Sequence, residues 1–463
     1  MRIRKHPNAW SRRSFLQTSA AGLSTLLAAP FRRLLGGGSA VAGPGAVRVF
    51  GGAASGLFSI DEVPDLPFTD AARPHAHAGV EALFSLMGGY GLKLYRSGAS
   101  GPLQGPWGII APDDVVLVKV NAQWKYRGTT NSDLVRGIVQ RILEHPDGFR
   151  GEVVIVENGQ GRGSLACDTA KAYGGDTGVH ANANDERQSF TYLAETLFRD
   201  PRVSTRLFDP IRANFLAADD HVQDGYRKMG LVSYPCFTTA GGRRVELREG
   251  VWTGSGYTQN LKLINVPVLK HHDKNGSEIT ASLKHFYGLV SMSDGNSPFR
   301  HYSRLGETAG TMITTVRTPA LNIIDATWVS FASIAGYPPE KTFRANRIVA
   351  SQDPVALDYW AAKNILYPID NNERHHPDFP GIQAWLTQAR DTINGAGGLL
   401  NLEAGILQNL VTKDESEMSI FSDSAARYVA EGPLPPQVPP GETSRGGRAQ
   451  GSAVRESSSR VRR

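Results

Sequence analysis

Two short, almost uninterrupted apolar runs constrain the fold of this chain more than any other feature. They are DVVLVKV (residues 114–120) and EVVIVEN (residues 152–158). Runs of this kind are typical of strands that are covered on both faces of a sheet. The segment between them repeats its apolar residues every fourth position, after Asn131 or Ser132 as a helix cap. The order therefore predicts a strand–helix–strand unit.

The same alternation continues along the chain. Three further β-branched runs occupy residues 261–269, 320–327 and 347–351. After the last run we expect a helix with Asp353 as its cap and Pro354 in its first turn. The whole pattern predicts an α/β fold, with a mainly parallel sheet flanked by helices. Residues 160–260 are Gly-rich and lack this periodicity, so we expect an irregular insertion or lid there.

The first 42 residues have the pattern of an export signal. Arg12 and Arg13 precede Ser-Phe-Leu, an Ala- and Leu-rich run follows, and residues 40–42 form a small-residue cleavage box. This order is typical of a twin-arginine signal peptide. We therefore expect the twin-arginine translocase as a partner, and a periplasmic or otherwise exported location. An uncleaved leader or a basic amphipathic anchor is the alternative, because two arginines interrupt the segment before the box.

Charge and composition separate both ends from the body of the chain. The formal net charge is +6, of which residues 1–42 carry +7 and residues 432–463 carry +4, leaving −5 for residues 43–431. The last segment is rich in Pro, Gly, Ser and Arg, and we expect it to be a disordered basic tail. The predicted α/β domain, residues 43–431, is thus not basic, and a nucleic-acid partner is not expected. We also expect no membrane span in the mature protein, since no apolar run of about 18 residues occurs.

The cysteine content limits the possible metal clusters. Cys167 and Cys236 are the only cysteines, and they do not form a CxxC pair. Because cysteine-bound clusters need more ligands, we expect no iron–sulfur cluster, and the cofactor remains unknown. In an exported protein the two cysteines are compatible with one disulfide or with two buried thiols.

Polar residues follow each predicted strand. In parallel sheets, ligands bind beyond the carboxyl ends of the strands. The residues at these positions are Lys119, Asn121, Glu157, Asn158, Lys270, His271, Asp325 and Asp353. We expect them to gather at one edge of the sheet and to form a binding site.

Five segments carry motifs of a known but uncharacterised family. They are VLVKVN (116–121), INVPVLKHH (264–272), ASLKHFYGLV (281–290), LNIIDA (321–326) and ASQDPVALDYWAA (350–362). Together they resemble the motifs of domain-of-unknown-function family 362. The resemblance implies an α/β domain but no activity. Many members add a ferredoxin-like cluster segment, which this chain lacks.

Lysine, histidine and acidic side chains are concentrated in residues 265–288. We expect a helix there with Asn275 and Glu278 in capping-box register and Gly288 as its stop. On its polar stripe, Lys284 would meet Lys270 and Lys119 near the amino terminus of the helix. Converging lysines and helix amide groups bind phosphate or carboxylate.

We therefore predict a site for an anionic small molecule or cofactor at the carboxyl edge of the sheet. His271 is the proton-transfer candidate because imidazole titrates near neutral pH, and Lys270 and Lys284 are further catalytic candidates. Alternatively, the lysines are solvated or pair with aspartates for structural reasons. The predicted ligand-binding residues are Lys119, Asn121, Lys270, Lys284, Asp325 and Asp353.

Two other functions stay open, and whether the protein is an enzyme is uncertain. One is a metal-dependent periplasmic enzyme in which His271 and His272 bind zinc or iron with an acid. Neighbouring strand residues point to opposite faces, which argues against this pair. The other is a non-catalytic partner or maturation factor of an exported redox system, with residues 160–260 as its contact surface. The remaining pair, His375 and His376, is expected in a surface turn.

Overall fold

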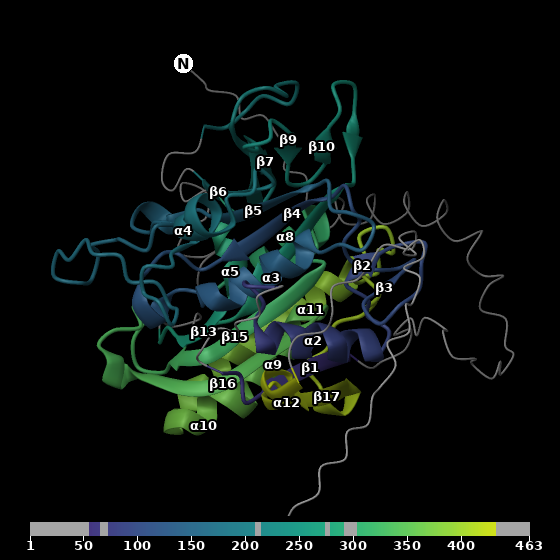
Figure 1. The fold of residues 1–463 in the computed structure, drawn as a ribbon. Coiled ribbons are helices and arrows are strands. Elements are labelled where there is room, and N and C mark those ends of the chain that lie inside the picture. Colours follow the sequence, from purple (N-terminus) through teal and green to yellow (C-terminus); the bar gives the residue numbers. More distant parts are fainter. Residues whose placement is uncertain (1–54, 65–72, 209–213, 274–277, 291–302, 432–463) are drawn as a thin grey trace, which may run out of the picture. The chain divides into compact units, whose positions relative to one another are not determined.

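The computed structural model describes residues 55–64, 73–208, 214–273, 278–290 and 303–431 (Figure 1). The predicted signal peptide and basic tail lie outside these residues, as does the predicted capping residue Asn275.

A large, mainly parallel β-sheet runs through the described part of the chain (Figure 1). Its order is β17 (Met418–Ser424), β1 (Ser55–Asp61), β16 (Thr342–Ser351), β15 (Leu321–Ser330), β12 (Leu261–Val266), β4 (Val115–Val120), β5 (Glu152–Glu157) and β6 (Val203–Leu207). A further strand, β13 (Val268–His271), pairs with β15 and with β14 (Ile279–Thr280). The predicted α/β fold class is confirmed.

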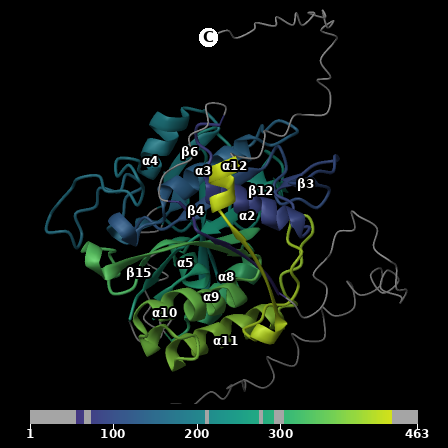
Figure 2. The same ribbon diagram turned by 60° about the horizontal axis from the view of Figure 1, so that its bottom comes forward.

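Helices cover both faces of this sheet (Figure 2). One side carries α2 (Ala78–Gly89), α3 (Ser132–Leu143) and α12 (Ala426–Glu431), and the other carries α5 (Ser282–His285), α8 (Leu305–Thr315), α9 (Pro354–Ala361) and α11 (Pro380–Gly395). Shorter elements are β2 (Tyr95–Arg96), β3 (Gln104–Gly105), α4 (Phe190–Tyr192) and α10 (Tyr367–Asp370). None of the helices in the described residues is long and apolar enough to cross a membrane.

The predicted strand–helix–strand unit is β4, α3 and β5. The two strands pair in parallel, with Val115 beside Glu152. The Asn131 side chain caps α3 by accepting a hydrogen bond of 3.0 Å from the backbone N–H of Leu134. Such a side-chain acceptor satisfies one of the amide groups that a helix start leaves free. The unit brings the ends of β4 and β5 to the same edge of the sheet.

The predicted strand of residues 261–269 is two strands, separated at Pro267. After this residue the chain pairs with β15 as β13, and then folds back as a hairpin in which Lys270 lies opposite Thr280. The prediction of a helix that includes Ile279 is therefore wrong. The helix begins only at Ser282, where the Asp358 carboxylate accepts the backbone N–H groups of two successive residues.

The fifth predicted strand, β16, runs antiparallel to β15, with Asn322 opposite Ser351. The prediction that all five strands end at one edge is wrong for this strand. Because the direction is reversed, Asp353 lies at the opposite end of the sheet from the other predicted site residues. It does cap the helix that follows, as expected, by accepting from the N–H groups of Val355 and Ala356.

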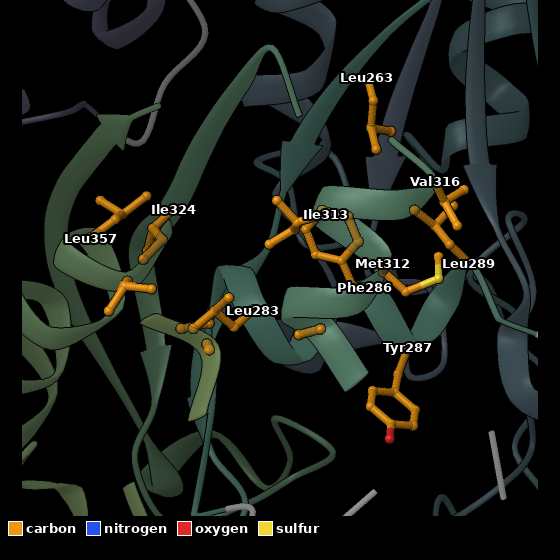
Figure 3. Close-up of a cluster of buried hydrophobic side chains, with 14 of the residues drawn as sticks. Leu263, Leu283, Phe286, Tyr287, Leu289, Met312, Ile313, Val316, Ile324 and Leu357 are labelled. Atoms are coloured by element: carbon orange, nitrogen blue, oxygen red, sulfur yellow. The ribbon is translucent and has the colours of Figure 1, made fainter. Parts of the chain in front are cut away.

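The main hydrophobic core fills the space between the sheet and the helix layer of α5, α8, α9 and α11 (Figure 3). Phe286 lies beside Met312 of α8, Leu283 belongs to the same cluster, and the sheet contributes Leu263 and Ile324. All five side chains are almost completely buried. Close packing of this kind fixes the short α5 segment against the sheet.

A second sheet forms within residues 160–260, the region predicted as an irregular insertion. Its five antiparallel strands are β7 (Gly225–Met229), β8 (Val232–Thr238), β9 (Arg244–Glu246), β10 (Gly250–Trp252) and β11 (Tyr257–Thr258). Of the two alternatives for the cysteines, the structure has free thiols, since Cys167 and Cys236 are both buried and unbonded. Burial raises the pKa of each thiol to about 12.

Candidate functional site

A cavity of about 610 Å³ opens at the carboxyl ends of β4, β5 and β13. Seven of the residues predicted at the site line it: Lys119, Asn121, Glu157, Lys270, His271, His272 and Lys284. The loop after β15 closes another side with Tyr337, and Trp124 and Arg162 contribute to the wall. Sequence analysis missed these three residues, which lie in irregular segments without periodicity.

Lys119 and Glu157 form a buried ion pair at the base of the cavity. The Lys119 Nζ atom lies 3.0 Å from Glu157 Oε2 and donates a second bond of 2.9 Å to the Val120 carbonyl. Glu157 also accepts from the backbone N–H of Asn158. Burial lowers the pKa of Lys119, and the neighbouring carboxylate opposes this shift.

Lys270 ends β13 beside this pair. Its Nζ atom donates a bond of 2.5 Å to the carbonyl oxygen of Gly128, and its side chain is buried. Burial lowers the pKa of Lys270 to about 7; Glu157 opposes the shift and Lys119 adds to it. An amine with this pKa changes between its protonated and its neutral form close to neutral pH.

Lys284 lies on α5 and is also buried, with 7 % of its surface exposed. Burial and the nearby charge of Lys270 lower its pKa well below the ordinary value, against the opposing effect of Glu278. Glu278 itself binds Arg374, with a distance of 3.0 Å to the guanidinium Nε. Within the described residues, Lys284 Nζ has no hydrogen-bond or ion-pair partner.

Gly288 allows the base of the cavity to pack closely. A Cβ atom at this position would lie 2.1 Å from Glu157 Oε1 and 2.2 Å from Lys119 Nζ. Any side chain would therefore displace the ion pair. From the sequence, this glycine is predicted only as a helix stop, because the close approach depends on Lys119 and Glu157 from two distant strands.

His285 is held in the same core by Asn265. The Asn265 amide donates to the Ser282 carbonyl and to Asn322 Oδ1, so its own oxygen accepts from His285 Nδ1 at 2.7 Å. Burial lowers the pKa of His285 well below the ordinary value, and the charges of Lys119 and Lys270 add to this effect. The ring is therefore a neutral part of the cavity wall.

The two predicted aspartates do not line the cavity. Asp325 accepts from the backbone N–H of Asn131 at 2.7 Å and from Thr327, so it orders the start of α3. Asp353 accepts from the backbone N–H of Thr412 and from the hydroxyl of Ser55, at the far end of the sheet. Each aspartate stabilises local structure in place of orienting the lysines.

A second group of polar side chains meets at His271. Its Nδ1 atom lies 3.0 Å from Asp273 Oδ2, and Asp273 Oδ1 lies 3.0 Å from His375 Nε2. The prediction of a surface turn for His375 is wrong, since its side chain is fully buried. His272 is not a member of this group. The alternative prediction pairs His271 with His272, whereas the structure groups His271 with His375.

One comparison with known proteins gives a result. The model of the family described as Domain of unknown function (DUF362) matches residues 242–363. These residues include Lys270, His271 and Lys284, whereas Lys119 and His375 lie outside the match. Searches of curated proteins and of solved structures found no match. The family match agrees with the resemblance of the sequence motifs, and it shows that residues 242–363 are similar to the DUF362 family.

Proposed function

We propose that the cavity binds an anionic small molecule or cofactor through a phosphate or carboxylate group. Lys119, Lys270 and Lys284 are the residues that contact this group. The observation that carries the proposal is the position of Lys284, a buried amine that lines the cavity and has no hydrogen-bond or ion-pair partner among the described residues.

The balance of charges supports this proposal. Burial of an ammonium group is costly unless an anion or several hydrogen bonds compensate it. Glu157 compensates Lys119, but no second carboxylate among the described residues pairs with Lys270 or Lys284. These amines reach a stable state by losing their protons or by binding an anion. The volume of about 610 Å³ is that of a small-molecule site.

The same residues offer groups for proton transfer. Lys270, with a pKa of about 7, exchanges a proton readily at neutral pH. His271 lies on the wall of the same cavity. Binding of the anion is the primary function that we propose, and proton transfer to a bound ligand is the reaction that these side chains support.

We also propose that the protein is exported through the twin-arginine pathway. The support is the order of the twin arginines, the apolar run and the cleavage box in residues 1–42. Replacement of Arg12 and Arg13 by lysine tests this part. We expect the protein to remain in the cytoplasmic fraction, and unchanged export would contradict the proposal.

Isothermal titration calorimetry of the purified protein tests the binding site. Phosphate, pyrophosphate and small mono-, di- and tricarboxylates are titrated into the wild type and the Lys284→Met variant. We expect at least one of these anions to bind the wild type and to lose ten- to hundredfold affinity in the variant. Lys363→Met is the matched control, because Lys363 pairs with Glu415 away from the cavity. Equal affinities in the wild type and Lys284→Met would reject the site.

A further inference from the structure

We propose that His271, Asp273 and His375 bind one divalent transition-metal ion, such as Zn²⁺, at the rim of the lysine cavity. This inference does not depend on the anion site, since none of the three lysines is a ligand. Only His271 is shared with the cavity wall.

The three side chains already stand at distances close to those of a metal centre. Their ligand atoms all lie within 4.8 Å of one another, and the two nitrogen–oxygen distances are 3.0 Å. Ligands at about 2.1 Å from a tetrahedral zinc ion are separated by about 3.4 Å. Because the two 3.0 Å distances involve different oxygens of Asp273, side-chain shifts of about 1–1.5 Å bring the three donors to such separations.

The contacts of His375 are compatible with a metal ligand that is oriented by a second carboxylate. Both ring nitrogens face carboxylates, with Nε2 3.0 Å from Asp273 and Nδ1 3.3 Å from Asp370. A neutral imidazole donates to one of these carboxylates and an imidazolium donates to both, whereas a ring that ligates a metal through Nε2 keeps a single N–H at Nδ1. With a metal at Nε2, the remaining N–H donates to Asp370. Carboxylates that orient metal-bound histidines in this way are a general feature of metal sites.

Contacts of Glu278 hold the two chain segments that carry the ligands. Asp273 has a left-handed conformation with φ of 44°, just after the end of β13. Its N–H and that of His272 both donate to the carbonyl oxygen of Glu278, which fixes the turn. The Glu278 side chain in turn binds Arg374, the residue before His375. One residue thus ties both ligand segments together, as a preorganised site requires.

The donor set defines the class of ion. Two imidazole nitrogens and one carboxylate oxygen suit zinc, iron and related transition metals better than magnesium or calcium, which prefer oxygen ligands. Three protein ligands leave at least one coordination position for water or a ligand.

Metal binding by the purified, tag-free protein tests this inference. The protein is treated with a chelator, dialysed, and titrated with Co²⁺ and with Zn²⁺. We expect one equivalent to bind, with a visible Co²⁺ absorption spectrum that Zn²⁺ abolishes. We expect His375→Ala and His271→Ala to lose at least tenfold in affinity. Asp370→Asn, which retains all three ligands, is expected to lose about tenfold or more.

His376→Asn is the matched control, since this adjacent histidine contacts Asp378 and not the proposed centre. It should bind Co²⁺ like the wild type. Absence of binding to the wild type, or equal binding by wild type, His375→Ala and Asp370→Asn, would overturn the metal site. The Lys284→Met variant separates the two proposals. It should still bind one Co²⁺, so loss of anion binding alone rejects neither the metal site nor its ligands.

Discussion

Lys119 Nζ lies 3.0 Å from Glu157 Oε2, directly against the α-carbon of Gly288. This contact divides the three cavity lysines into two kinds. Lys119 is compensated within the protein, whereas Lys270 and Lys284 face the cavity with no carboxylate of their own among the described residues. Of the three cavity lysines, only Lys270 and Lys284 thus lack an ion-pair partner among the described residues.

The close contact at Gly288 gives a first prediction. Gly288→Ala places a methyl group against the ion pair, and we expect it to lower the free energy of unfolding by about 1–3 kcal/mol. It should also weaken anion binding, because Lys119 and Glu157 must move. Gly89→Ala is the control, since no atom lies within 4 Å of a Cβ there. Chemical denaturation measures both; a Gly288→Ala variant as stable as Gly89→Ala would show that the base of the cavity is not tightly packed.

Removal of the unpaired amine should stabilise the protein. Lys284→Met replaces a buried ammonium by an apolar group of similar length, and we expect the free energy of unfolding to rise by about 1–4 kcal/mol without ligand. The same variant loses anion binding, so stability and binding change in opposite directions. Urea denaturation at pH 7 measures the effect. A destabilised variant would indicate that Lys284 has a structural partner.

The pKa of Lys270 leads to a prediction for pH. In the unfolded chain this lysine titrates near 10.5, and in the folded protein near 7. Between these values the unfolded state holds a proton that the folded state lacks, so stability without ligand should rise as pH increases from 7 to 10.5. Thermal unfolding at pH 7, 8 and 9 measures this trend. The Lys270→Gln variant should show a weaker dependence, and an identical one would assign the effect to other groups.

Anion binding should show the opposite dependence. A bound carboxylate favours the protonated amine, so binding above pH 7 takes up protons and the affinity falls by up to about tenfold per pH unit. Calorimetry in two buffers of different ionisation enthalpy counts the protons. Lys270→Gln should take up fewer than the wild type. Binding without proton uptake at pH 8 would mean that the amines are already charged.

Asp353 should matter for stability alone. Its carboxylate accepts four hydrogen bonds, from Ser55, Val355, Ala356 and Thr412. Asp353→Ala leaves the buried N–H groups without an acceptor, and we expect a loss of about 2–3 kcal/mol in the free energy of unfolding. Anion affinity should be unchanged in calorimetry. A clear loss of anion affinity in a folded Asp353→Ala variant would indicate that Asp353 contributes to the binding site.

Strong local patterns were sufficient to predict the central sheet. The apolar runs that form β4 and β5 are unambiguous, and the caps at Asn131 and Asp353 depend on residues only two or three positions away. The approach of Lys119 and Lys270 to one cavity follows from the rule that parallel strands end at one edge, and Lys284 was predicted from the polar stripe of the next helix. These features depend on neighbours in sequence or on the direction of parallel strands.

The failures depend on distant partners. The direction of β16 cannot be derived from its composition, and it removed Asp353 from the site. The segment around Ile279 has a helical pattern but pairs with β13, because an acceptor from α9, Asp358, starts the helix later. His375 is buried and lies beside Asp273, which is distant in sequence. Such contacts leave no periodic trace in one sequence.

The pairing of β1 has a consequence for biosynthesis. This first described strand lies between β16 and β17, and each of its residues from Ser55 to Asp61 has a parallel partner in Met418–Ser424. A growing polypeptide cannot complete that edge until its last strand has left the ribosome. Closure of such a long loop is slow, and the open edge of β1 remains exposed until then. The edge of β1 therefore stays available for non-native strand pairing until residues 418–424 have been synthesised.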